Sequence, residues 1–115
     1  MGVVTNVTDK YQTCIDACGR CAQACFECFD ACLQEVDVIA RKNCIKVLVE
    51  CGKMCSMSAA VMSMSGEFAK QQCNLCADIC NRCAQECATF KDDHCQKCAE
   101  ECRTCEKECR NMGAR

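Results

Sequence analysis

Residues 14–32 read CIDACGRCAQACFECFDAC, and cysteine returns in this stretch at steps of four, three, four, three and four residues. Side chains three and four residues apart lie on one face of an α-helix. At about 1.5 Å per residue such a helix rises roughly 27 Å, so one face would carry thiols along its whole length. The stretch therefore predicts a helix whose core positions, usually Leu, Ile or Val, are cysteine.

Two later segments, 73–87 and 95–109, repeat this spacing with five cysteines each. We call each set of cysteines on one helical face a cysteine ladder. The nineteen cysteines of the chain are Cys14, Cys18, Cys21, Cys25, Cys28, Cys32, Cys44, Cys51, Cys55, Cys73, Cys76, Cys80, Cys83, Cys87, Cys95, Cys98, Cys102, Cys105 and Cys109.

The segment between the first two full ladders carries a thinner one. Its cysteines are Cys44, Cys51 and Cys55. Leu48 takes the skipped position, and Ser58 and Met62 continue the same phase. This segment is also the most apolar, and we expect it to pack the core when the thiols hold no metal. Its apolar residues are Val36, Ile39, Ile45, Val47, Leu48, Val49, Val61 and Met62.

Breaks in the pattern divide the chain into four helices, expected at about residues 8–34, 36–63, 66–90 and 93–112. The chain has no proline to interrupt them. Short connections favour antiparallel neighbours. We therefore expect an all-α fold, an antiparallel up-down-up-down four-helix bundle with a Cys-lined core, that forms a single domain over residues 1–115.

Polar residues and one glycine mark the expected helix ends. Thr8 or Asp9 is a candidate N-cap for the first helix, and Asp93 for the last. Ser65 and Gly66 form the clearest turn, with Ser65 as a candidate N-cap and Gly66 expected to adopt a positive φ.

Charge and hydropathy exclude several classes of partner. Fourteen Lys and Arg against sixteen Asp and Glu leave a net charge of −2, too small to steer the chain to nucleic acid or an anionic membrane. No apolar run approaches the ~18 residues that cross a bilayer. Residues 1–12 lack the apolar run of a secretory signal peptide, so we expect the reducing cytoplasm. An odd number of cysteines also prevents complete pairing into internal disulfides.

Thiolate is a soft ligand that suits Cu(I), Zn²⁺ or iron–sulfur clusters. Zinc and iron–sulfur sites gather four cysteines around one point, whereas this chain spreads sulfur evenly along helices. Cu(I) is satisfied by two or three thiolates, so neighbouring sulfurs in one helix or across the bundle would each hold an ion. One Cu⁺ per thiolate leaves a neutral core, while tetrathiolate zinc leaves about −2 at each buried site. The pattern thus favours many Cu(I) ions per chain.

Other interpretations remain open at this point. Free cysteine packs as a small hydrophobic residue, but Leu and Val would fill a core without the risk of oxidation. A zinc or cadmium thiolate buffer of the metallothionein type would also need many thiols, and an iron–sulfur redox protein needs several. Catalysis is not expected, because nineteen equivalent thiols do not single out one reactive cysteine.

Two residues outside the cysteine set are candidate auxiliary ligands. His94 stands just before the last ladder and, in an antiparallel bundle, near the same end as Cys32, Cys44 and Cys87. It is either a surface residue or a ligand at the point where the metal enters. Met62 continues the thin ladder and would supply a thioether, or it only fills the core.

The ladders at residues 14–32, 73–87 and 95–109 resemble those of the bacterial copper storage proteins, specifically the cytosolic type that has no export signal. The resemblance runs from about residue 8 to residue 112, and so many Cys-x-x-Cys and Cys-x-x-x-Cys steps on proline-free helices are a specific signature.

The resemblance implies a homotetramer of four-helix bundles, each filled with Cu(I), for cytosolic copper storage or detoxification. It implies a ligand role for all nineteen cysteines. Copper would enter at one open end of the bundle, where His94 is the first candidate, and a copper donor or acceptor protein is an expected partner. Phe26 and Phe29 lie beside the first ladder and offer a surface to another subunit.

Overall fold

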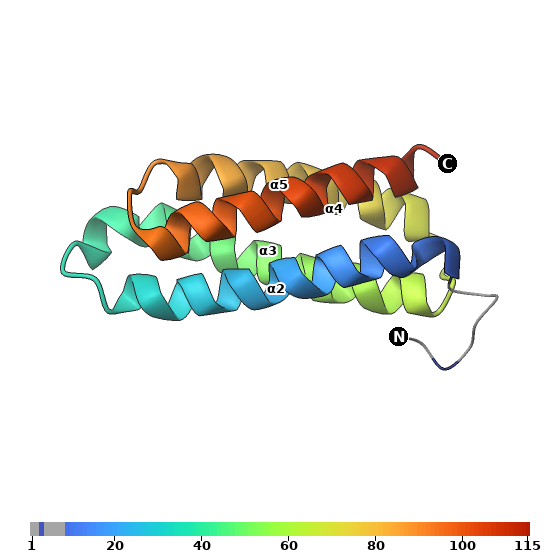
Figure 1. The fold of residues 1–115 in the computed structure, drawn as a ribbon, viewed down its shortest axis with the longest axis horizontal. Helices are drawn as coiled ribbons and strands as arrows, with labels where there is room; N and C mark the ends of the chain where they lie inside the picture. Colours follow the sequence, from blue (N-terminus) through green and yellow to red (C-terminus); the bar gives the residue numbers. More distant parts are fainter. Residues whose placement is uncertain (1–2, 4–8) are drawn as a thin grey trace.

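The computed structural model describes Val3 and residues 9–115, and shows four long helices packed side by side (Figure 1). Its elements are η1 (Asp9–Tyr11), α2 (Gln12–Leu33), η2 (Val38–Arg41), α3 (Lys42–Ser63), α4 (Ala69–Ala88) and α5 (Asp93–Gly113). Each helix packs against the next one, and α5 returns to pack against α2. The part of the chain that the structure describes has no strand, so the expected all-α, up-down-up-down bundle is confirmed.

The bundle has two distinct ends. The turn between α3 and α4 and the C-terminus lie at one, which we call the C-terminal end (Figure 1). The loops at residues 34–41 and 89–92 lie at the other, which we call the loop end.

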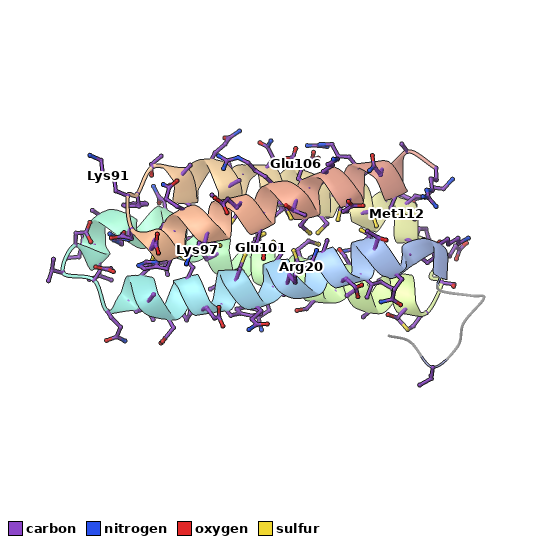
Figure 2. All side chains as sticks on the ribbon, viewed as in Figure 1. Arg20, Lys91, Lys97, Glu101, Glu106 and Met112 are labelled. Atoms are coloured by element: carbon purple, nitrogen blue, oxygen red, sulfur yellow. The ribbon has the colours of Figure 1, made fainter. Side chains whose placement is uncertain are left out.

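Sulfur forms the core, as the ladders predict. All nineteen cysteines are at most 1% exposed. Figure 2 shows sulfur atoms in the space between the helices. Of the other side chains, Leu48 and Met62 are the largest that are fully buried. Alanines such as Ala77 and Ala99 lie beside the cysteines. The ladder spacing therefore determines which face of each helix turns inward.

The second helix begins later than expected. The sequence predicts a helix from residue 36, but α3 starts at Lys42, after a turn and η2. Val36 and Ile39 are 103% and 81% exposed, so the prediction that they pack the core is wrong. The reason is local, because Arg41 turns its side chain inward and bonds back to Asp37, which fixes a tight 3₁₀ turn.

The other helix ends differ by smaller amounts. The third helix spans residues 69–88 rather than 66–90, and the fourth ends at residue 113 rather than 112. Asp92, not Asp93, is the N-cap of α5. The first helix begins at residue 12 after the turn at residues 9–11. The candidate cap Thr8 lies outside the described residues.

In the turn between α3 and α4, Ser65 and not Gly66 adopts the positive φ that the sequence suggested for the glycine. Ser65 has the positive φ, 50°, and no glycine among the described residues does. The cap of α4 is Phe68 rather than Ser65. Gly66 is needed for space, because a Cβ there would lie 2.8 Å from Cγ1 of Val61. Its amide donates to the Val61 carbonyl at 2.9 Å, which holds the turn against the end of α3.

Candidate metal centre

The ladders of α2 and α5 face each other across the bundle. Antiparallel packing of two helices with the same cysteine spacing brings their rungs together along the full length. The Sγ–Sγ distances include Cys14–Cys109 at 3.6 Å, Cys18–Cys105 at 3.6 Å, Cys21–Cys102 at 3.7 Å, Cys25–Cys102 at 3.9 Å and Cys28–Cys95 at 3.8 Å. These two helices thus form one continuous double row of sulfur.

The thin ladder of α3 meets the ladder of α4 in the same way. Its Sγ–Sγ distances to α4 are Cys44–Cys87 at 3.7 Å, Cys51–Cys80 at 3.8 Å, Cys55–Cys80 at 3.7 Å and Cys55–Cys76 at 3.8 Å. Cys55 also lies 3.8 Å from Cys105 of α5. That contact joins the two double rows into a single sulfur core.

Within this core the sulfurs gather in overlapping groups of four. In each group the ligand atoms lie within 4.8 Å of one another. Three of the all-cysteine groups are Cys18/Cys76/Cys105/Cys109, Cys21/Cys55/Cys80/Cys105 and Cys21/Cys25/Cys51/Cys102, and a fourth is Cys25/Cys83/Cys98/Cys102. Cys21, Cys25, Cys102 and Cys105 each belong to two of these groups. Such shared sulfurs suit bridging thiolates between neighbouring ions better than separate closed sites.

The thiols are free, and their burial and close contacts shift their pKa values in both directions, downward at Cys14 and upward at Cys95. All nineteen are unpaired by disulfides. Burial raises the pKa of the Cys95 thiol to about 12, and the neighbouring Cys32 adds to that rise. A metal ion that binds to Cys95 must therefore displace a proton that this thiol holds firmly at neutral pH.

His94 joins the sulfur core at the loop end. Its Nδ1 lies 3.4 Å from Cys28 Sγ and 3.5 Å from Cys95 Sγ. Together with Cys32 these residues form a four-ligand group. Nε2 lies 3.0 Å from Glu35, a carboxylate that orients the ring as an outer partner of a histidine ligand does.

The structure places His94 at the same end of the bundle as Cys32, Cys44 and Cys87, since α3 begins and α4 ends there. Its contacts are with Cys28 and Cys95, so the ring lies over the row formed by α2 and α5.

Arg41 is the residue of this region that the sequence analysis missed. Its side chain is buried, 4% exposed for the whole residue, and Nη1 donates to Cys32 Sγ at 3.7 Å and Cys95 Sγ at 3.6 Å. Nε bonds Asp37 at 2.6 Å and Nη2 bonds Asp92 at 2.5 Å. The guanidinium lowers the pKa of Asp92, and these carboxylates in turn keep the pKa of Arg41 high.

Phe90 completes the surroundings of Arg41, with its ring centroid 4.5 Å from the guanidinium carbon. A single buried cation thus connects the two loops of the loop end to the last sulfurs of the core. Arg41 stands three residues before Cys44 and so continues the phase of the thin ladder by one position, which is the signal that could have found it. Its pairing with Asp37 four residues earlier says less, because that spacing is also common on exposed helix surfaces.

The thin ladder keeps its phase with other side chains. Leu48, Ser58 and Met62 are all 0% exposed, so each occupies a core position as the spacing predicts. The Ser58 hydroxyl donates to the Met54 carbonyl at 2.9 Å. Met62 brings a buried thioether to the C-terminal end of the core.

Among the helices that the structure describes, none has the length and apolar character required to cross a bilayer.

Comparison with solved structures finds close relatives of this bundle. The Cu(I)-bound copper storage protein 3 of Bacillus subtilis is 41% identical, with a TM-score of 0.86 over 89% of this chain and 96% of that chain. The cytosolic copper storage protein of Streptomyces lividans, in a structure with five coppers, is 37% identical, with a TM-score of 0.90 over 94% and 95% of the two chains. A structure of the Streptomyces lividans copper storage protein loaded with ten copper equivalents is 35% identical, with a TM-score of 0.88 over 99% and 92%.

A search of curated proteins found no match. A family model described as Copper storage protein, in contrast, matches residues 7–114, nearly the whole chain. The sulfur core, the bundle and these comparisons agree, and the chain belongs to the copper storage protein family.

Proposed function

We propose that this chain binds and stores many Cu(I) ions through its cysteine thiolates, in the cytoplasm and without catalysis. The observation that carries the proposal is the sulfur core itself. Nineteen free thiols are buried in one bundle, and sulfurs of neighbouring helices approach to 3.6–4.0 Å, as between Cys14 and Cys109 and between Cys25 and Cys98. All nineteen are proposed as ligands, within a single domain that spans residues 1–115.

The shared groups argue for Cu(I) over zinc or cadmium. A tetrathiolate zinc site needs four sulfurs of its own, but Cys21 and Cys102 each belong to two groups. Filling one such site would take ligands from the next. Cu(I) accepts two or three thiolates and tolerates bridging, so the same sulfurs can serve adjacent ions. An iron–sulfur redox protein is disfavoured for the same reason, because its clusters also need separate sets of ligands.

His94 and Met62 are proposed as auxiliary ligands. The imidazole Nδ1 lies next to Cys28 and Cys95, where it would complete the coordination of an ion at the loop end. Met62 lies in the core in the phase of the ladder, and its thioether is soft enough for Cu(I).

The relatives support both the cargo and the compartment. One is described as bound to Cu(I), another as a cytosolic protein loaded with five coppers. We propose the same cargo and compartment here, for storage of copper or protection against it. We also propose a homo-oligomer, specifically a homotetramer. Phe26, Leu33 and Leu75, which are 38%, 45% and 48% exposed, are apolar surface available to another subunit. A copper donor or acceptor protein would complete the cycle of loading and release.

Anaerobic titration of the reduced apo-protein with Cu(I), against a competing chelator, tests the proposal. We expect tight binding of about one ion per thiol. Thiolate is a soft ligand that suits Cu(I), and one Cu⁺ per thiolate leaves the buried core neutral. A plateau at a few ions would contradict the proposal. A parallel titration with Zn²⁺ should reach a much lower number and should be displaced by Cu(I). Visible charge-transfer absorption in the purified protein would instead indicate iron–sulfur clusters.

A further inference from the structure

The guanidinium of Arg41 connects both loops of the loop end (Figure 1) to the sulfur core. Its Nε bonds Asp37 at 2.6 Å, and its Nη2 bonds Asp92 at 2.5 Å. The third nitrogen, Nη1, lies 3.7 Å from Cys32 Sγ and 3.6 Å from Cys95 Sγ. The two carboxylates thus fix the plane of the guanidinium so that one nitrogen, with both of its hydrogens, faces two sulfurs.

These two sulfurs are poor acceptors while they carry protons. A thiol accepts hydrogen bonds only weakly, and Arg41 is just 4% exposed, so Nη1 is poorly satisfied in the metal-free protein. A buried donor in that position costs free energy. The thiol of Cys95 in addition points its own proton towards Asp92 Oδ2, at 3.9 Å. The carboxylates therefore hold Arg41 firmly, and the sulfurs hold it loosely.

Copper binding would make the same sulfurs strong acceptors. The four-ligand group of the loop end consists of Cys28, Cys32, His94 and Cys95. A cuprous ion that binds this group displaces the thiol protons. A metal-bound thiolate retains negative charge, and charge-assisted hydrogen bonds are roughly twice as strong as neutral ones. The donor that faces the sulfurs is already in place, so these bonds can form without any movement of Arg41.

From this geometry we propose that Arg41 is a positioning residue for copper at the loop end: its Nη1 bonds the copper-bound thiolates of Cys32 and Cys95 and so couples the filling of this group to the order of both loops. This proposal rests on the function proposed above. An interaction that is stronger in the filled state shifts the loops towards their ordered conformation. The displaced thiol protons pass to solvent, the guanidinium keeps its own protons, and no electron is transferred.

Hydrogen exchange tests this coupling. Amide exchange of residues 34–41 and 89–92 is measured by mass spectrometry in the reduced metal-free protein and in the copper-filled protein. We expect filling to slow exchange in both loops about tenfold in the wild type and hardly at all in Arg41→Met. Residues 64–68, at the C-terminal end, should respond equally in the two proteins. Equal slowing of the loops in Arg41→Met would show that the copper ligands alone order them, and would overturn the proposal.

Two further variants separate the hydrogen bonds of Arg41 from its charge. Arg82→Met is the matched control, since Arg82 also pairs with a carboxylate, that of Glu86, but is exposed on α4. It should show the slowing of the wild type. Arg41→Lys keeps the charge but lacks the planar fork that reaches carboxylates and sulfurs together, so it should restore less than half of the effect. Full restoration by lysine would overturn the role of Nη1.

Copper affinity gives a second test. We expect Arg41→Met to keep the wild-type copper number but to weaken binding at the loop end about tenfold, as the loss of a bond to a metal ligand does. Chelator competition measures it. The same substitution should have little effect in a chain with Cys32→Ser and Cys95→Ser, where Nη1 faces no copper-bound thiolate. Equal weakening in the two backgrounds would show that Arg41 acts through the stability of the fold, and would overturn the proposal.

The failure of this proposal differs from the failure of the proposed function. A wild-type chain that binds only a few copper ions contradicts the function. A chain that fills normally, with loops that tighten independently of Arg41, contradicts only the coupling.

Discussion

Gly52 of α3 lies against the ring of Phe26 of α2, so closely that a Cβ at position 52 would come within 2.7 Å of Phe26 Cε1. Gly19, in the middle of α2, has no other atom within 4 Å of the corresponding position. Both glycines lie inside helices and lower helix propensity, but only Gly52 is explained by a close contact. The two positions form a natural pair for mutagenesis.

We expect Gly19→Ala to raise the free energy of unfolding of the apo-protein by about 1 kcal/mol, the usual gain in helix propensity. Gly52→Ala should instead lower it by about 1 kcal/mol, because the loss of packing around the displaced Phe26 ring outweighs the gain in helix propensity. Chemical denaturation of the reduced protein measures both. Equal gains at the two positions would show that the ring moves aside freely.

Substitution of Arg41 should lower the free energy of unfolding more than substitution of an exposed charged residue does. Arg41→Met leaves Asp37 and Asp92 without their cation, and we expect the free energy of unfolding to fall by about 2 kcal/mol. The loss stays below that of a fully buried pair, because the two carboxylates are 47% and 29% exposed and can hydrate. Arg82→Met removes an exposed pair with Glu86 and is the control, with an expected change of at most about 0.5 kcal/mol. Similar losses in the two variants would contradict this account.

The apo-protein should lose stability in alkali. The pKa of Cys95 is about 12 in the folded chain, above the ordinary value of 9.0. The folded state therefore keeps a proton that the unfolded state has already released, so this stabilisation is complete below about pH 9 and is lost as the pH rises towards 12. Denaturation curves at pH 7, 9 and 10.5 under reducing conditions measure the decline. Cys95→Ser has one fewer thiol to titrate and should decline less steeply.

Shared ligands should matter more for copper capacity than peripheral ones. Cys102 lies 3.7 Å from Cys21 and 3.9 Å from Cys25 and belongs to two four-thiol groups. We expect Cys102→Ser to reduce tightly bound copper by about two ions, and Cys44→Ser, at the edge of the core, by about one or fewer. Anaerobic titration with chelator competition gives both numbers. Equal losses would indicate independent sites rather than bridged ones.

The bundle was predictable because its signal repeats over long distances. Steps of three and four residues fix one inward face over more than five turns, and no local preference competes with so regular a pattern. For that reason the spacing predicted the burial of Leu48, Ser58 and Met62 as correctly as that of Cys51. The same reasoning gave four helices and their order.

Apart from the inward position of Arg41, the details of the loop end were not predictable from spacing. Val36 and Ile39 look like core residues in the sequence, but they are exposed because Arg41 and Asp37 form a turn that rotates this segment outward. Which sulfurs meet across the bundle also depends on the lengths of the loops, because they set the register of antiparallel helices. The contact between His94 and Cys28 is one result of that register.

Filling the sulfur core with Cu(I) leaves the net charge of the protein unchanged. When one Cu⁺ replaces one thiol proton, the formal net charge stays at −2 however many ions are bound. Empty and filled chains would then share an isoelectric point and migrate together in native electrophoresis and ion exchange. A partner that collects copper from filled chains must therefore distinguish them by a change in conformation or flexibility, or by direct contact with the metal, and not by surface charge.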